Sequence, residues 1–186
     1  LSGDLENLKS FYMDRGFLDF KINSTTVSIS KNKKNIYIAL NIDEGDKYKI
    51  GTIKLSGRIP GEVKSKLNEA VTLESLKSEL FIKEGDIFNR KLVNQSTKAM
   101  SNKLGNYGYA FANVNAMPDI DKINNIVNFN FTLDSGKRIY VRRISLEGNE
   151  KTKDEVIRRE LRQIEGAWFS QEDIDRSRAR LGNTQF

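Results

Sequence analysis

The chain has 186 residues, a length that fits one or two domains, and its net charge of +6 is modest and spread along the chain. Histidine and cysteine are both absent, which argues against zinc, haem and iron–sulfur sites and removes the commonest acid–base side chain of neutral pH. With no phosphate-binding glycine loop or nucleophile motif in the sequence either, we expect no enzyme, no cofactor and no metal.

The first part of the chain reads as a helix followed by two strands. Leu5, Leu8 and Tyr12 share one helical face, and the next apolar stretch runs from Phe17 to Ile29. A second strand follows, with alternating apolar residues at Ile36, Ile38, Leu40 and Ile42.

The middle part begins with a strand from Tyr48 to Leu55 whose alternation changes phase. Tyr48 and Ile50 share one parity, whereas Ile53 and Leu55 share the other. A slip of one residue turns the apolar side chains to the opposite face, so we expect a β-bulge near Gly51.

Two helices and two strands follow this strand. The first helical region contains Val63, Leu67 and Ala70, then Leu73, Leu76 and Leu80 in a changed phase. Asn89 is the expected cap of the second helix, which presents Leu92, Val93, Met100 and Leu104 on one stripe. The strand from Ala110 to Pro118 suits a sheet edge because proline cannot donate to a ladder, and residues 127–133 alternate as a half-buried strand.

The last part repeats the beginning of the middle part. It predicts a strand from Arg138 to Leu146, a helix from Lys153 to Ile164 and a second helix from Gln171 to about Leu181. The phase change recurs here, so a second bulge is expected near Arg142.

An internal repeat explains this order of elements. The glycines at 45 and 57 recur 91 positions later as Gly136 and Gly148, and Gly16-Phe17 recurs as Gly108-Tyr109. Glu84-Gly85 likewise recurs as Glu165-Gly166. A repeat of this size indicates small tandem modules, which we place at residues 1–46, 47–136 and 137–186.

The complete middle module, β-α-α-β-β with a glycine–aromatic pair after its second helix, resembles the POTRA domain. Residues 11–17 look like the family's helix end, and residues 156–168 look like the last POTRA domain of outer-membrane β-barrel assembly factors. The resemblance covers the whole chain and implies the second half of a third domain, a complete fourth, and the first half of a fifth. It implies an α+β fold in which two helices cover one face of a three-stranded mixed sheet.

The resemblance also implies a function. Such domains lie at the periplasmic face of the Gram-negative outer membrane, below a membrane-embedded barrel of the same protein. They dock BamD-like and other assembly lipoproteins, guide unfolded outer-membrane proteins, and have no nucleic-acid partner. Alternatives are a POTRA region of a two-partner secretion transporter or of another barrel-assembly homologue, and a basic nucleic-acid-binding module.

The predicted lipoprotein-binding residues are Arg158, Arg162 and Glu165. Ile157, Leu161 and Ile164 are expected to face inward, which leaves the two arginines stacked on another helical face, where like charges repel. This arrangement suggests a carboxylate partner from another chain. Glu165 is expected at the helix end, and its partner-binding role is implied by the resemblance.

The second predicted device is strand addition, in which an extended peptide pairs with an open sheet edge. The candidate edges are the stretches 20–28 and 110–117. The residues predicted to form these edges are Phe20, Lys21, Ile22, Asn23, Ala110, Ala112 and Val114. If the sequence is the whole polypeptide, residues 137–186 of one chain are expected to complete residues 1–46 of another. Trp168, the single tryptophan, is expected to pack the second helix onto its module.

Overall fold

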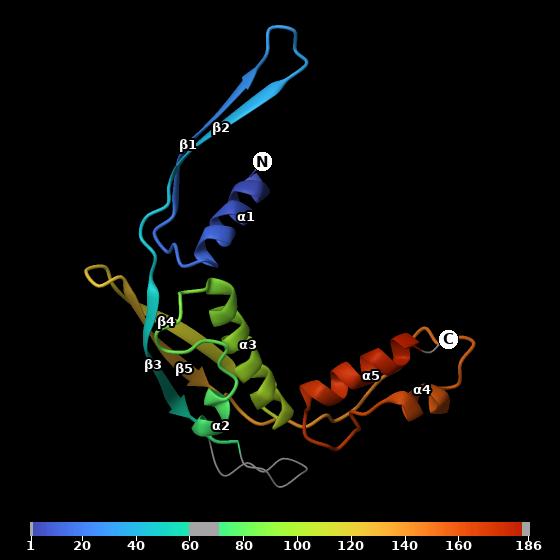
Figure 1. The fold of residues 1–186 in the computed structure, drawn as a ribbon. Helices are drawn as coiled ribbons and strands as arrows, with labels where there is room; N and C mark the ends of the chain where they lie inside the picture. Colours follow the sequence, from blue (N-terminus) through green and yellow to red (C-terminus); the bar gives the residue numbers. More distant parts are fainter. Residues whose placement is uncertain (1, 60–70, 184–186) are drawn as a thin grey trace. The chain divides into compact units, whose positions relative to one another are not determined.

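The computed structural model describes residues 2–59 and 71–183, and Figure 1 shows its helices and strands. The elements are α1 (Ser2–Met13), β1 (Lys21–Ile29), β2 (Ile36–Asp43), β3 (Lys49–Arg58), α2 (Leu73–Lys77), α3 (Arg90–Asn106), β4 (Asn113–Asp121), β5 (Ile126–Asp134), α4 (Asp154–Glu160) and α5 (Gln171–Asn183). The predicted helix through Val63, Leu67 and Ala70 lies outside the described residues.

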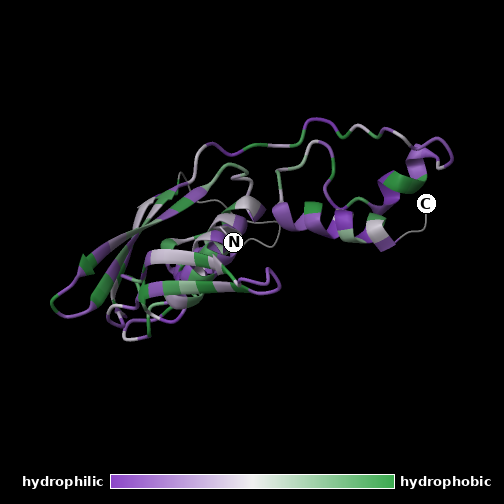
Figure 2. Ribbon diagram, turned by 90° about the horizontal axis from the view of Figure 1, so that it is seen from above, coloured by the Kyte–Doolittle hydropathy of each residue, from purple (hydrophilic) through white to green (hydrophobic). Residues whose placement is uncertain are grey.

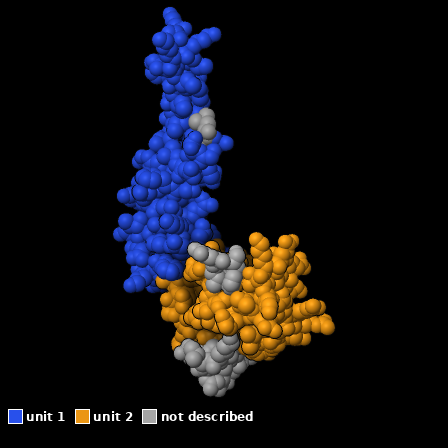
Figure 3. Space-filling model, turned by 90° about the vertical axis from the view of Figure 1, so that its right-hand side faces the viewer, with its two compact units in different colours: residues 1–54, 81–95, 117–130 blue, residues 55–80, 96–116, 131–186 orange. Residues whose placement is uncertain are grey.

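Contacts divide the chain into two compact units, coloured separately in Figure 3. Unit 1 comprises residues 1–54, 81–95 and 117–130, and unit 2 comprises residues 55–80, 96–116 and 131–186. The strands β3, β4 and β5 and the helix α3 each contribute residues to both units. The predicted modules therefore do not coincide with these units, and the boundaries at 46 and 136 stay a prediction.

Unit 1 contains an antiparallel hairpin of β1 and β2. Its register shifts between Ile22 and Ser24, so Asn23 is an extra residue in β1. The apolar residues of β2 are exposed, with 66% of Ile36 and 53% of Ile38 open to solvent. Near the end of α1, the ring of Tyr12 stacks on that of Phe20 at a centroid distance of 4.1 Å, which anchors the chain just before β1.

A three-stranded sheet with the order β3-β5-β4 forms the middle of the chain. The central strand alternates as predicted, with Val127, Phe129, Phe131 and Leu133 all buried. The second helix also matches its prediction, since Val93, Met100 and Leu104 are buried and Asn89 accepts a hydrogen bond from the Leu92 N–H.

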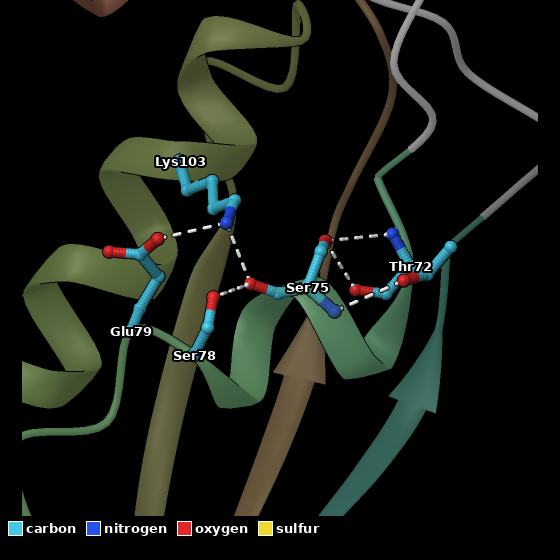
Figure 4. Close-up of polar contacts among 5 residues, drawn as sticks. All are labelled: Thr72, Ser75, Ser78, Glu79 and Lys103. Atoms are coloured by element: carbon cyan, nitrogen blue, oxygen red, sulfur yellow. Dashed lines mark hydrogen bonds and ion pairs between the residues drawn. The ribbon is translucent and has the colours of Figure 1, made fainter.

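Polar contacts fix α2 against α3, as Figure 4 shows. Thr72 and Ser75 form a reciprocal capping box at the start of α2. The Lys103 ammonium on α3 donates to the Ser75 carbonyl at 2.7 Å and pairs with Glu79 at 2.8 Å. Because these bonds satisfy backbone groups at both ends of α2, a helix of only five residues is stable here.

The predicted bulge at Gly51 is confirmed by the direction of the backbone N–H groups in β3. The Ile50 N–H donates to the Asp86 carbonyl at 2.8 Å and the Ile53 N–H donates to Glu84 at 3.0 Å, both on the side of residues 84–88. The Thr52 N–H donates instead to Asn128 of β5 at 2.8 Å. The N–H groups of Ile50 and Ile53, which are three positions apart, therefore point to the same side of β3. In a regular strand, groups that point to the same side are two positions apart.

Two predicted boundaries and one predicted strand are wrong. Residues 110–112 form a turn, and the strand that was expected to start at Ala110 starts at Asn113. Residues 138–146 form no strand and share only an isolated bridge, between Tyr140 and Trp168. The helix expected to reach Ile164 ends at Glu160, because Leu161 is extended. The charged helices α4 and α5 are mostly hydrophilic, with few apolar residues (Figure 2).

Candidate functional site

The predicted lipoprotein-binding residues lie in unit 2, where two of them contact one backbone unit. The Ile144 N–H donates to Glu165 Oε1 at 2.8 Å, and Arg158 Nη2 donates to the Ile144 carbonyl at 3.0 Å. Arg158 Nη1 also pairs with Glu165 Oε1 at 3.2 Å. Three groups thus form a closed set of hydrogen bonds, which we call the Ile144 clip.

The clip sets the electrostatics of Glu165. The hydrogen bond from the Ile144 N–H is the main cause that lowers the pKa of Glu165, and the bond from Arg158 lowers it further. Both side chains of the ion pair are 42% exposed, so solvent screens their attraction. The chemistry available is that of an anionic hydrogen-bond acceptor, and nothing in the geometry suggests proton transfer.

A buried glutamine builds the loop that carries Glu165. Gln163 is 4% exposed, accepts a hydrogen bond from the Ser170 N–H and donates to the Trp168 carbonyl. Ser177 of α5 accepts a bond from the Arg162 N–H at 2.7 Å. The bonds to Ser177 take the N–H groups of Arg162 and Gln163, which a longer α4 would use, and this explains why the helix ends early. Nothing in the sequence marks Gln163 as a buried residue, since its side chain is polar.

The early helix end changes the prediction for the charged residues. Glu165 lies in a loop beyond the end of α4, rather than at the helix end where it was expected. Arg158 and Arg162 are not stacked on one helix, and Arg158 finds its carboxylate partner within the chain. Ile164, which was expected to face inward, is 58% exposed. Arg162 is exposed, and its side chain makes no ion pair with the residues that the structure describes.

The first predicted strand-addition edge is β1. Lys21, Ile22 and Asn23 all lie in this strand, with Asn23 at the bulge. Phe20 lies before the strand and is only 3% exposed, so its side chain belongs to the core. Among the described residues, β1 pairs with β2 alone, and its other side has no neighbouring strand.

The second predicted edge is β4, which is an outer strand of its sheet. Ala110 and Ala112 lie in the preceding turn, so their assignment to this edge is wrong. Val114 lies in β4, but its side chain is buried at 4% exposure. Only backbone groups of Val114 can therefore contribute to strand addition.

Trp168, in the loop that carries Glu165, makes a cation–aromatic contact with Arg138 that was not predicted from the sequence. The Arg138 guanidinium lies 4.1 Å from the ring centre of Trp168, and Arg138 Nε donates to the Tyr107 carbonyl at 2.7 Å. Trp168 is 47% exposed, so it is not the buried plug that was expected. The sequence signal that could have identified Arg138 is its position 91 residues after Lys47. Lys47 makes a similar contact with an aromatic ring, because its ammonium lies 5.2 Å from the ring of Phe17.

Residues 2–59 and 71–183 contain neither a candidate metal site nor a candidate membrane-spanning helix. No group of three or more acidic residues there is arranged to hold a metal ion. No helix there combines the length and the apolar character needed to cross a membrane.

Comparisons with known proteins give the family. The POTRA family profile (surface antigen variable number repeat) matches residues 1–45, 48–136 and 139–186. The outer membrane protein assembly factor BamA of Buchnera aphidicola is 30% identical over 100% of this chain, and BamA of Neisseria meningitidis serogroup B is 29% identical over 96%. The chain spans 28% and 21% of the lengths of these two relatives.

Solved structures agree with this match. The crystal structure of POTRA domains 3–5 of BamA from Haemophilus influenzae is 28% identical, with a TM-score of 0.79 over 100% of this chain and 69% of that one. BamA from Haemophilus ducreyi lacking POTRA domains 1–3 is 32% identical, with a TM-score of 0.59 over 72% of this chain and 24% of that one. The chain therefore belongs to the POTRA family, and its tandem repeats correspond to the third to fifth POTRA domains of BamA.

Proposed function

We propose that this chain is a periplasmic scaffold of outer-membrane protein assembly, which docks partner lipoproteins and guides unfolded outer-membrane proteins by strand addition. The observation that carries the proposal is the similarity over the full chain to POTRA domains 3–5 of a BamA protein. Relatives with this arrangement are named as assembly factors of the outer membrane. The same similarity supports a location at the periplasmic face of the outer membrane.

Strand addition is supported by the open edges of β1 and β4. An edge strand offers N–H and C=O groups that pair with an extended peptide largely irrespective of its sequence, which suits a protein that handles many clients. Each of these strands has one neighbouring strand among the described residues.

Lipoprotein docking is supported by the exposed charges around the Ile144 clip. Arg162 presents a positive charge without an ion pair among the described residues, and Glu165 keeps a partly exposed carboxylate. A BamD-like lipoprotein with complementary charges fits this surface, since charged groups at an interface fix its partner and register.

Binding of the parent protein's periplasmic region to purified BamD-like lipoprotein tests this docking proposal. Arg162→Glu reverses a charge outside the clip and is expected to weaken binding at least about tenfold, the range for a truncated interfacial charge. Arg178→Glu, which changes an arginine on α5 that is 78% exposed, is the matched control and should bind as the wild type does.

Glu165→Lys and the double variant Arg158→Glu/Glu165→Lys separate surface charge from clip integrity. If the surface charge matters, both variants lose binding, although the double variant regains an ion pair. Wild-type binding by both Arg162→Glu and Glu165→Lys would contradict a docking role for this surface.

A further inference from the structure

Two loops of equivalent sequence make the same backbone bonds to the segment that opens their module, which is β3 in the middle module and residues 138–146 in the last. We call residues 84–88 and 165–169 the Glu-Gly loops. In the first loop, the Gly85 N–H donates to the Ile50 carbonyl at 2.7 Å and the Phe88 N–H to the Tyr48 carbonyl at 2.9 Å. In the second, the Gly166 N–H donates to the Val141 carbonyl at 2.7 Å and the Phe169 N–H to the Ile139 carbonyl at 3.1 Å.

The glutamate of each loop extends this pattern by one more bond. Beyond the bulge, Glu84 Oε1 accepts from the Ile53 N–H at 3.0 Å, and Glu165 Oε1 accepts from the Ile144 N–H at 2.8 Å. A side-chain carboxylate therefore takes the next outward-facing donor where the loop backbone no longer reaches. Ile53 and Ile144 are 91 residues apart, and Glu84 and Glu165 are 81 residues apart. The same bond therefore recurs at equivalent positions of the repeat.

We propose that Glu84 and Glu165 close the outer side of the segments that open their modules, so that in the middle module an added strand pairs at the opposite edge of the sheet. The proposal rests on the strand addition of the proposed function, to which it adds a direction. In the middle module, the closed stretch is residues 48–53, at and just before the start of β3, and the open edge is that of β4.

The physical reason is the supply of unpaired backbone groups. Strand addition requires a row of free N–H and C=O groups at every second residue. On the outer side of β3, the groups of Tyr48, Ile50 and Ile53 already bond to the Glu-Gly loop. A competing peptide would have to break these bonds, including one to a charged acceptor, which is stronger than a bond between neutral groups. On β4, no described strand or loop occupies the outer side in this way.

The last module closes its edge more completely than the middle one. Arg158 donates to the Ile144 carbonyl as well as pairing with Glu165, so both the N–H and the C=O of Ile144 are used. The residue 81 positions before Arg158 is Lys77, at the end of α2. Arg158 thus distinguishes the two edges, and the edge at Ile144 should resist an added strand more strongly.

Amide hydrogen exchange of the whole chain tests the proposal directly. Glu84→Ala and Glu165→Ala should each lower the protection of a single amide, Ile53 and Ile144 respectively, by roughly five- to tenfold, the equivalent of one lost hydrogen bond. Glu84→Gln and Glu165→Gln are the matched controls, because the amide oxygen still accepts, and they should retain most of that protection. Unchanged protection in the alanine variants would overturn the proposal.

The glutamine variants also decide the case in which an alanine variant destabilises the whole module. Retained protection at Ile53 and Ile144 with glutamine would then support the acceptor role, whereas a loss there would refute it.

A peptide probe tests the direction of strand addition. A short peptide of alternating valine and threonine with a nitroxide label should broaden the amide signals of β4 in the wild type. In Glu84→Ala it should broaden those of β3 as well. Broadening of β3 in the wild type would overturn the proposal. Absence of broadening at every strand would count against strand addition itself, while the exchange experiment still decides the role of the glutamates.

Discussion

β3 and residues 138–146 start from equivalent sequences 91 positions apart, and only β3 forms a strand. On the outer side the two segments are nearly identical, because each bonds to the Glu-Gly loop that follows it. On the inner side they differ. Lys49 donates to the Asn125 carbonyl at 2.9 Å and Thr52 to Asn128, whereas no described strand lies beside residues 138–146.

The difference separates local from distant causes. The outer edge depends on a loop about 40 residues or fewer along the chain, and it forms in both modules. The inner edge of β3 depends on a strand more than 70 residues away in sequence, and no described strand lies beside residues 138–146. A strand-like sequence forms a ladder only with a partner strand beside it.

The largest expected effect comes from the glycines that end the two segments. Gly57 has a φ of +126°, and a Cβ there would lie 2.5 Å from the Leu133 carbonyl oxygen, whereas a Cβ at Gly148 (φ +80°) meets nothing within 4 Å. Gly57→Ala should lower the free energy of unfolding by about 4 kcal/mol, from backbone strain and overpacking together. Gly148→Ala should cost only about 1 kcal/mol, from strain alone.

Urea denaturation of both glycine variants measures this contrast. Equal losses of stability would show that the sheet of the middle module does not hold Gly57 in place, and that the two segments differ less than their structures indicate.

The second-largest expected effect is the loss of stability when an apolar side chain is truncated at equivalent positions of the two segments. Ile50 is 2% exposed, and Val141, its counterpart 91 residues later, is partly exposed. Ile50→Ala should therefore cost about 3 kcal/mol, within the range for truncating a buried isoleucine, and Val141→Ala about 1 kcal/mol. Thermal unfolding of the two variants compares them. A cost of Val141→Ala as large as that of Ile50→Ala would mean that residues 138–146 have a packed inner face.

Much of the fold was predictable because its signals are local. The alternation of residues 127–133, the cap at Asn89 and the phase change at Gly51 each depend on residues within a few positions, and each prediction is confirmed. The late start of β4 was not predictable from alternation, because Ala110 and Ala112 fit a strand or a turn equally well. Tertiary pairing with β5 decides where the ladder begins.

The candidate site was predictable in its residues but not in their contacts. The sequence placed Arg158 and Glu165 together, yet it predicted a helix reaching Ile164 and a partner from another chain. What ends α4 is a bond from the Arg162 N–H to Ser177, 15 residues further on, and the buried side chain of Gln163. A single sequence carries no signal that these particular polar residues are buried. The lipoprotein contact and the choice of edge stay predictions.

A smaller expected effect is a dependence of stability on pH that arises at the first segment and not at the second. At the start of β3, the Tyr48 hydroxyl donates to Asp19 at 2.7 Å, and this bond, followed by burial, raises the pKa of Tyr48 to about 12. The equivalent residue of the last module is Ile139, which has no such group. A raised phenol pKa contributes stability below its ordinary value of 10.0 and loses it as the pH rises through about 12.

Tyr48→Phe should consequently cost about 1.5 kcal/mol at pH 8, the value of a hydrogen bond to a charged group. The gap to the wild type should narrow between pH 10 and 12. Urea denaturation at several pH values measures it, with Tyr140→Phe, whose ring is 60% exposed, as the control. A gap that stays constant up to pH 12 would contradict the bond to Asp19 as the source of the stability.

The smallest effect sharpens the comparison at the outer edge, where the two segments agree most closely. The Ile144 N–H is the main cause that lowers the pKa of Glu165, so the clip contributes stability above the ordinary glutamate value of 4.5 and loses it as the pH falls through the lowered value. Protection of the Ile144 amide against exchange, corrected for the intrinsic rate, should fall in that acid range. In Glu165→Gln the protection should not change with pH there, because the amide does not titrate. A fall of equal size in Glu165→Gln would assign the acid effect to another carboxylate. The outer edge of the last module would then be held by the loop backbone rather than by Glu165.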